Sequence, residues 1–356
     1  MKRIGAAALA AMVLSGAAPG LLAADFSLEQ HSGARQLAGE LAASGIERDW
    51  LETTFDAAVF QQDVLDAMAG AVERHLRWDE YREIFLQPER IVRGVEFIKE
   101  HAEAFARAEQ EYGVPPEVIA AIIGVETSYG RFTGRHRVLD SLATLAFHHP
   151  VRGTFFRGEL AAFLEIAWEQ EVDPGSLKGS YAGAMGYPQF IPTSYRAYAV
   201  DFDGDGVRDL WTNPVDAIGS VANYFAEHRW RPGEPIYAEA EGPDSPPSVV
   251  DFNRTQPPYA EVSELEQAGI TAASVLGDGT KVVPLALERD ASSWRYRLGF
   301  ENFYVITRYN HSHLYAMAVT ELAEAIAQAY STEGTAPTSG TVESESTSGK
   351  GTGDEW

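Results

Sequence analysis

The sequence contains no cysteine, and this absence removes several kinds of chemistry at once. Disulfide bonds, a thiol nucleophile and cysteine-ligated metals are all excluded. A lipid carried on an N-terminal cysteine is excluded as well, because that modification needs the thiol. We therefore expect no stable membrane anchor of the lipoprotein kind.

Basic residues are scarce relative to acidic ones. The 356 residues include 28 Lys and Arg against 52 Asp and Glu, which gives a formal net charge of −24. Proteins that bind nucleic acid neutralise phosphates with clustered Lys and Arg, so we expect no nucleic-acid partner. The acidic excess favours solubility and says little about the fold.

Long apolar runs are also scarce, and the only one that could cross a membrane is residues 4–24. It follows Lys2 and Arg3, is rich in Ala and Leu, and ends in small residues, as a cleaved signal peptide does. An uncleaved anchor is the alternative. Pro19 and the Ala-rich character favour cleavage, so residues 1–24 are predicted to be a signal peptide.

The rest of the chain divides by composition into helical and non-helical stretches. Helical patterns over residues 50–69 and 89–108 predict a helical subdomain at 25–110. A second helical block with a Gly-rich turn region covers 111–230 and is expected to form the core.

The composition and the residue pattern change in the C-terminal third. Prolines cluster after residue 231, and residues 274–287 read as two short strands around a Gly-Asp-Gly turn, so 231–299 is predicted to be a small β-rich subdomain. Residues 300–332 are expected to return to the core through a strand-like entry and an Ala-rich helix. Residues 333–356, rich in Gly, Ser, Thr and acid, are predicted to form a disordered tail.

One carboxylate in the second block shares a helix face with apolar residues. Pro115 and Pro116 are typical of a helix start, and Ile119 and Ile122 lie seven and four residues before Glu126. Desolvation there would raise the pKa of Glu126. A carboxylic acid that stays protonated near neutral pH can protonate a glycosidic oxygen. The alternative is a Glu paired with an Arg, and Asp140 is a more natural helix cap than a second catalytic acid.

An acidic loop matches the opening of an EF-hand calcium loop. Asp201, Asp203 and Asp205 alternate before Gly206, and the backbone carbonyl of Val207 would follow as a ligand. The twelfth position is a threonine, which cannot close the site, so Asp209 and Asp216 remain rival ligands. The alternative is a surface turn without an ion. The histidines form no convincing zinc site.

Several long segments resemble one family of cell-wall enzymes. They are GVETSYGRFTG, LDSLATLAF, LKGSYAGAMGYPQFIPTSY, AVDFDGDG, PVDAIGSVANYF and FYVITRYNHSHLYAMAV. In this order and spacing they resemble the membrane-bound lytic murein transglycosylase B family, from about residue 81 to about residue 329. The resemblance implies a mainly α (α+β) fold with a lysozyme-like catalytic core, an N-terminal helical subdomain and a small β-rich subdomain.

The resemblance also assigns roles to residues. It implies that Glu126 is the only catalytic carboxylate, first as acid and then as base, so that the 6-hydroxyl of N-acetylmuramic acid closes a 1,6-anhydro ring. It implies that Asp216 completes a structural calcium site with Asp201, Asp203, Asp205 and Val207, with no catalytic cofactor. The substrate-binding positions that it implies are Ser180, Gln189, Phe190, Tyr224, Tyr309, Asn310, Arg152, Tyr81 and Tyr315.

Two of these positions carry an alternative, and one departs from the family pattern. Phe190 and Tyr224 could equally be core residues. Arg152 matches one of two adjacent arginines of the family, and Val151 replaces the other.

The prediction is therefore a monomeric, periplasmic lytic transglycosylase that cleaves the β-1,4 bond between N-acetylmuramic acid and N-acetylglucosamine in peptidoglycan glycan strands. Two alternatives are a hydrolytic muramidase and a non-catalytic peptidoglycan-binding protein.

Overall fold

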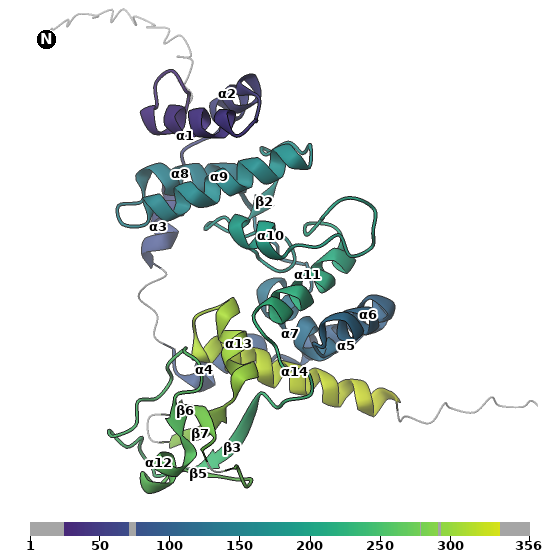
Figure 1. The fold of residues 1–356 in the computed structure, drawn as a ribbon, viewed down its shortest axis with the longest axis vertical. Helices are drawn as coiled ribbons and strands as arrows, with labels where there is room; N and C mark the ends of the chain where they lie inside the picture. The colour runs from purple at the N-terminus through teal and green to yellow at the C-terminus, as the bar shows by residue number, and fades with distance from the viewer. Residues whose placement is uncertain (1–24, 71–75, 278, 291–292, 335–356) are drawn as a thin grey trace, which may run out of the picture. The chain divides into compact units, whose positions relative to one another are not determined.

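The computed structural model describes residues 25–70, 76–277, 279–290 and 293–334 (Figure 1). The predicted signal peptide lies outside these residues, and so does nearly all of the predicted tail. The last helix ends at Gly334, so the first two residues of the expected tail are helical. Within the described residues, none of the helices is both long enough and apolar enough to span a bilayer.

The fold is mainly helical with a small antiparallel sheet, as predicted. The described residues divide into two compact units, one made of those within 25–70 and 133–197 and the other of those within 76–132 and 198–334. The expected helical subdomain at 25–110 and core at 111–230 are thus each shared between units. The physical reason is packing: the third helix packs on the eighth, whereas the fifth packs on the seventh.

The first unit is built around two long helices that lie side by side (Figure 1). Its elements are α1 (Ser32–Ala43), α2 (Arg48–Ala57), α3 (Gln62–Gly70), β1 (His136–Arg137), α8 (Val138–His148), α9 (Gly153–Glu169), β2 (Lys178–Gly179) and α10 (Pro192–Tyr198), whose last residue belongs to the second unit. Asp140 lies in the first turn of α8 and is buried, accepting the Val59 N–H at 3.0 Å and pairing with Arg137 at 3.1 Å. It therefore holds structure together and is not a free carboxylate.

The second unit contains the remaining elements. They are α4 (Trp78–Phe85), α5 (Pro88–Glu100), α6 (Ala102–Tyr112), α7 (Pro116–Thr127), α11 (Pro214–Glu227), β3 (Tyr237–Glu241), β4 (Ala260–Glu261), α12 (Val262–Gln267), β5 (Thr271–Ala272), β6 (Lys281–Asp290), β7 (Ser293–Gly299), α13 (Glu301–Tyr309) and α14 (His313–Gly334).

Helix α7 is the central helix of the second unit. It begins at Pro116 as predicted, and its residues from Val118 to Val125 are all buried. It packs against α5, α6, α11 and α14, which explains why it is apolar all round rather than on one stripe. The apolar positions around Glu126 are therefore core positions, and Glu126 itself stands in the last turn of this helix.

The sheet of the second unit has the strand order β4-β6-β7-β3-β5, with antiparallel pairs throughout. The long hairpin is β6 with β7, where Val283 pairs with Gly299. One prediction fails here: residues 274–277 and 279–280 form no strand, and β5 pairs with β3 instead of β6. The physical reason is that Val275 is fully exposed and has nothing to pack on.

The expected strand-like entry at the start of the return segment is a second error, because residues 301–309 form α13. Phe303 and Ile306 are three residues apart and both fully buried, which is helical spacing. Asn302 is also buried, and its side chain bonds the N–H and the C=O of Arg231 at 2.8 and 2.9 Å and the C=O of Glu234 at 2.9 Å. This one amide fixes the chain segment that leads into the sheet.

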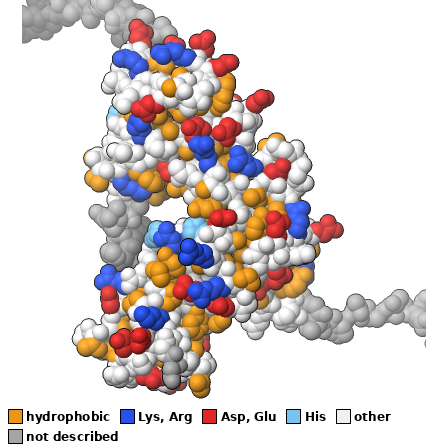
Figure 2. Space-filling view, viewed as in Figure 1, with side chains coloured by type: hydrophobic (Ala, Val, Ile, Leu, Met, Phe, Trp, Pro, Cys, Tyr) orange, Lys and Arg blue, Asp and Glu red, His pale blue; other side chains and the backbone are white. Residues whose placement is uncertain are grey.

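On the face shown in Figure 2, acidic and basic side chains are interspersed, so the negative excess is not gathered into one patch in this view. A mixed surface of this kind suits solubility.

We expect Asn302→Ala to destabilise the second unit, because it leaves buried N–H and C=O groups without partners. Such losses cost about 1–3 kcal/mol each. Chemical denaturation followed by circular dichroism measures the change. The control is Gln267→Ala, an exposed amide at the end of α12, which should leave the unfolding midpoint unchanged. Equal midpoints for the two variants would show that Asn302 is not the clamp described above.

Candidate active site

The carboxylate of Glu126 is held at the end of α7 by one strong hydrogen bond. The hydroxyl of Tyr315 on α14 donates to Glu126 Oε1 at 2.6 Å. The chain then turns away sharply, since Ser128 and Tyr129 both have positive φ, at 50° and 61°. This turn ends the helix and leaves the Glu126 side chain partly exposed.

Burial raises the pKa of Glu126 to about 7, and the hydrogen bond from Tyr315 acts in the opposite direction. No charged group of the described residues contributes to this shift. The second unit therefore provides a lone carboxylic acid that keeps its proton up to neutral pH. Such a group can give a proton to a leaving oxygen and take one back.

Tyrosines surround this carboxylate. The rings of Tyr309 and Tyr315 stack with centroids 6.4 Å apart and an interplanar angle of 9°. The charge of Glu126 contributes to raising the pKa of Tyr81 to about 12, after burial, which places Tyr81 near the carboxylate. The structure thus brings Glu126, Tyr81, Tyr309 and Tyr315 together in one unit.

Tyr224 belongs to the same group of aromatic residues but is buried. Its hydroxyl donates to the carbonyl of Arg308 at 2.7 Å, and its ring contacts Tyr309 at 4.8 Å. Sequence reasoning missed two neighbours, His228, stacked on Tyr224 at 4.1 Å, and Tyr198 at 4.8 Å. The spacing of Tyr224 and His228, four residues apart on one helix, was the available signal.

Asn310 follows α13 directly and is exposed. Its side chain is therefore available to a ligand next to Tyr309.

The first unit carries the Gly-rich loop with Ser180, Gln189 and Phe190. The hydroxyl oxygen of Ser180 accepts the N–H of Ala184 at 3.0 Å, and the Gln189 amide nitrogen donates to the carbonyls of Thr133 and Gly186 at 3.1 and 2.9 Å. These bonds use the donors of Gln189 and leave its amide oxygen for a ligand. Phe190 is buried and pairs with Met185 through the backbone.

Glycine is required at one position in this loop. Gly183 has φ +81°, and a Cβ there would lie 2.4 Å from the Leu142 side chain. The loop is therefore pressed closely onto α8.

Arg152 is exposed at the start of α9, where its guanidinium lies over the rings of Phe155 and Phe156 at 4.6 and 5.0 Å. This cation–π contact orients the side chain and keeps its charge at the surface.

The acidic loop brings its three alternating carboxylates together. Oxygen atoms of Asp201, Asp203 and Asp205 lie within 4.8 Å of one another. Asp201 also accepts the N–H groups of Gly204 and Gly206, both at 2.8 Å, so the loop has the curvature of a cation-binding loop. Converging carboxylate oxygens fit Ca²⁺, a hard cation with oxygen ligands.

Asp216 lies at the start of α11, completely buried beneath this loop. Its oxygens accept the N–H groups of Phe202 at 2.7 Å and Asp209 at 2.8 Å, and the charge of Asp203 acts on it. The rival, Asp209, directs its carboxylate into its own turn, onto the N–H groups of Trp211 and Thr212 at 2.8 and 3.0 Å. Both carboxylates therefore accept backbone N–H groups, Asp216 from beneath the loop and Asp209 within its own turn.

Comparison with known proteins identifies the family. The model of the family described as Transglycosylase SLT domain matches residues 29–324. The chain belongs to this family. It is a lytic transglycosylase that acts on peptidoglycan, which confirms the enzyme class expected from the sequence.

Three relatives support the assignment. The Escherichia coli membrane-bound lytic murein transglycosylase B is 48% identical over 71% of this chain and 68% of its own length. The crystal structure of the soluble lytic transglycosylase SltB1 from Pseudomonas aeruginosa is 49% identical and has a TM-score of 0.79, covering 84% of this chain and 99% of that one. The Escherichia coli lytic transglycosylase Slt35 in complex with calcium is 42% identical, with a TM-score of 0.79, covering 87% and 96%.

The raised pKa of Glu126 predicts a pH-dependent effect of Glu126→Gln on stability. The folded-state pKa, about 7, lies above the ordinary value of 4.5. At low pH the carboxyl group is neutral in the folded and the unfolded protein, so it does not lower the free energy of unfolding. As the pH rises from 4.5 to 7, the carboxyl group ionises more readily in the unfolded protein, and the free energy of unfolding falls. Above pH 7 this loss of stability is constant. The Gln variant keeps an acceptor for Tyr315 but carries no charge. Its melting temperature should exceed that of the unaltered protein at pH 8 and equal it near pH 4.

Differential scanning calorimetry at the two pH values measures this difference. Glu52→Gln, on the exposed face of α2, serves as control and should change neither melting temperature. A Glu126→Gln variant with the same offset at both pH values would contradict the raised pKa.

Proposed function

We propose that Glu126 is the single catalytic group of this transglycosylase and acts at the β-1,4 bond between N-acetylmuramic acid and N-acetylglucosamine. As an acid it gives its proton to the bridging oxygen, which leaves with the N-acetylglucosamine. As a carboxylate it then takes the proton of the 6-hydroxyl of the same N-acetylmuramic acid. That oxygen closes onto the anomeric carbon, and the strand ends in a 1,6-anhydro sugar without consuming water.

The observation that carries this proposal is a pKa of about 7 for a carboxyl group that no other charged group perturbs. A group with this pKa is half protonated at neutral pH and serves both steps. The intramolecular nucleophile needs no second carboxylate to activate a water, because it is already held next to the reacting carbon.

A hydrolytic muramidase would need a second carboxylate, at about 5–9.5 Å from the first. No acidic group of the described residues contributes to the raised pKa of Glu126. The lone acid therefore favours transglycosylation over hydrolysis.

The residues proposed to bind the glycan have different parts to play. Tyr81, Tyr309 and Asn310 offer rings and an amide next to Glu126, and Tyr315 positions the carboxylate through its hydroxyl. In the first unit, Ser180 and the Gln189 amide oxygen are proposed polar contacts for the glycan. Arg152 is proposed to offer a charge for a peptide or lactyl carboxylate. Phe190 and Tyr224, being buried, are assigned a supporting part, in which they hold the neighbouring groups in position.

Calcium is the proposed structural cofactor, held by Asp201, Asp203, Asp205, Asp216 and the carbonyl of Val207. The three neighbouring carboxylates of Asp201, Asp203 and Asp205 repel one another unless a cation balances them. The buried Asp216 has a second lone pair on each oxygen for the ion. The ion would tie the loop to the first turn of α11. The complex of Slt35 with calcium supports this assignment.

We further propose that the protein works as a monomer in the periplasm after export. The pattern of residues 1–24 and the peptidoglycan substrate support this location.

Glu126→Gln should abolish release of anhydro-muropeptides from purified murein while leaving the fold intact. Loss of general acid catalysis alone lowers turnover by about 10²–10⁴. Mass spectrometry of the released fragments measures both the rate and the product. The matched control is Glu117→Gln, on the same helix, where burial also raises the pKa of the carboxyl group. A Glu126→Gln enzyme with more than about a tenth of the original rate would rule out the assignment, and reducing ends in place of anhydro ends would favour the muramidase.

Removing calcium should lower the melting temperature more than the turnover at 25 °C, because an ion bound only by the folded state stabilises by mass action. Thermal denaturation in EGTA and in millimolar calcium measures the difference. In Asp216→Asn the difference should be much smaller, whereas Asp209→Asn should retain it. Equal melting temperatures in EGTA and calcium for the unaltered protein would refute the site.

A further inference from the structure

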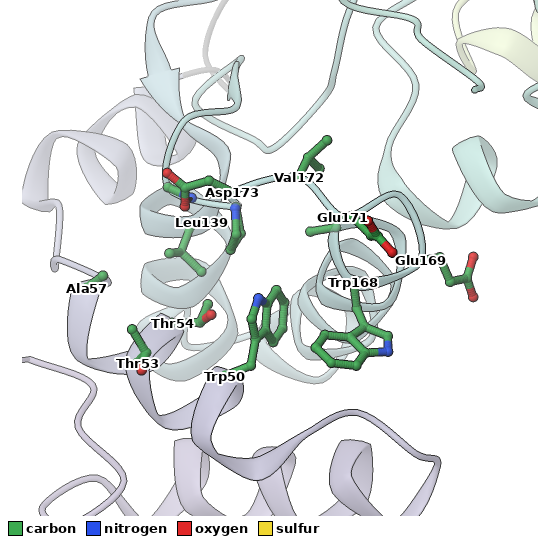
Figure 3. A pocket seen from close by; sticks show the side chains of 13 residues that line it. Trp50, Thr53, Thr54, Ala57, Leu139, Trp168, Glu169, Glu171, Val172 and Asp173 are labelled. Carbon is green, nitrogen blue, oxygen red and sulfur yellow. Dashed lines mark hydrogen bonds between the residues drawn. The ribbon is translucent and has the colours of Figure 1, made fainter. Parts of the chain in front are cut away.

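The first unit contains a pocket of about 720 Å³ that the proposed catalytic machinery does not use. It is lined by side chains from α2 and α8 and by the end of α9 with the turn that follows, as Figure 3 shows. Its volume lies within the range of ordinary small-molecule sites.

Two tryptophans form one wall of this pocket. The rings of Trp50 on α2 and Trp168 on α9 are 5.4 Å apart and inclined at 68°, so their faces meet at a corner. Both side chains are partly exposed. In Figure 3 the ring of Trp50 stands at the floor of the hollow. Partly exposed indole faces are surfaces on which a flat apolar face of a ligand can pack.

The polar groups of the pocket are both donors and acceptors. Among the described residues, the indole N–H groups of Trp50 and Trp168 have no acceptor. The carboxylate of Glu171 is exposed, and Asp173 uses one oxygen to accept the Gly175 N–H at 2.9 Å, which leaves the other open. Glu171 has φ +54°, a conformation that a non-glycine residue rarely adopts and that aims its side chain out of the helical path.

These features decide the chemistry of the ligand. The acidic rim repels anions. The cations beside it are occupied: Arg137 donates to the carbonyls of Ala57 and Gly175 and to Asp140, and Arg196 pairs with Glu169 at 3.8 Å. An ammonium ligand would satisfy the carboxylates but leave the indole donors without acceptors. A neutral sugar has a flat apolar face, hydroxyl donors for the carboxylates and an acetamido oxygen for an indole N–H.

We propose that this pocket binds an uncharged N-acetylhexosamine unit of a glycan strand. It would hold stretches of the strand that lack peptide stems, since stem carboxylates would meet Glu171 and Asp173. The inference rests on the proposed function in one respect: the sugar belongs to the same polymer that Glu126 cleaves.

Fluorine NMR of protein labelled with 5-fluorotryptophan tests this directly. The Glu126→Gln protein has seven tryptophan resonances, and Trp50→Phe and Trp168→Phe identify two of them. Titration with tri-N-acetylchitotriose should shift both in a saturable manner at millimolar concentration. The resonance of Trp294, on β7 in the sheet of the second unit, should not move.

Variants then separate packing from hydrogen bonding. Trp50→Ala should weaken binding, read from the Trp168 resonance, by about tenfold, as loss of an aromatic anchor does. Trp50→Phe keeps a ring but no N–H, so its affinity for the sugar should lie between those of the unaltered pocket and of Trp50→Ala. This variant keeps the test valid if the Ala variant is unstable. When Trp50→Ala is added to the Glu126→Gln protein, its binding to purified sacculi should weaken as its binding to the trisaccharide does. Adding Trp294→Phe instead should leave binding to sacculi unchanged.

Three outcomes overturn the proposal. In the first, the Trp50 and Trp168 resonances stay fixed during the sugar titration while others move. In the second, Nα-acetyl-lysinamide shifts these two resonances and the sugar does not. In the third, Trp50→Ala and Trp50→Phe both bind the sugar as the unaltered pocket does. Failure of the proposed function is a separate result, because it would show as anhydro products released by the Glu126→Gln protein.

Discussion

The hydrogen bond from the Tyr315 hydroxyl to Glu126 joins two helices that are 189 residues apart in the chain. It sets the direction of the carboxylate and limits how far burial can raise its pKa, because a hydrogen bond to the charged form favours ionisation. Without it, desolvation alone would act on Glu126, and the acid would hold its proton more tightly. The balance between these two effects is what suits one group to both donate and accept a proton.

The packing of α7 is the source of the other effect, the desolvation of Glu126. Every residue from Val118 to Val125 is buried, so the helix cannot shift without opening the core of its unit. Gly124 is part of the same constraint, since a Cβ there would lie 2.6 Å from the hydroxyl oxygen of Tyr129. Glu126, the proposed acid, thus stands on a rigid element, as a preorganised site requires.

The sequence allowed the chemistry to be predicted better than the topology. Glu126 could be found because a charged residue within an apolar helix is conspicuous, and the start of its helix because Pro116 marks it. The partner Tyr315 was accessible only through family resemblance, because no local pattern links positions so distant. The strand pairing was missed because β5 and β6 both pair with strands other than each other, and α13 was misread because Phe303 and Val305 also alternate as a strand would. Long-range pairing, which local periodicity does not encode, decided both cases.

Contacts within the second unit connect the acidic loop to Glu126. Asp216 lies beneath the loop at the start of α11, and the same helix carries Tyr224 two turns later. Tyr224 contacts Tyr309 at 4.8 Å, Tyr309 stacks on Tyr315, and Tyr315 bonds Glu126. A cation in the loop would therefore steady the helix at the far end of this aromatic series without approaching the reacting bond. The series also explains why Tyr224 is buried: its ring and its bond to the Arg308 carbonyl fix the end of α13, from which Tyr309 and Asn310 extend toward the substrate in the proposed mechanism.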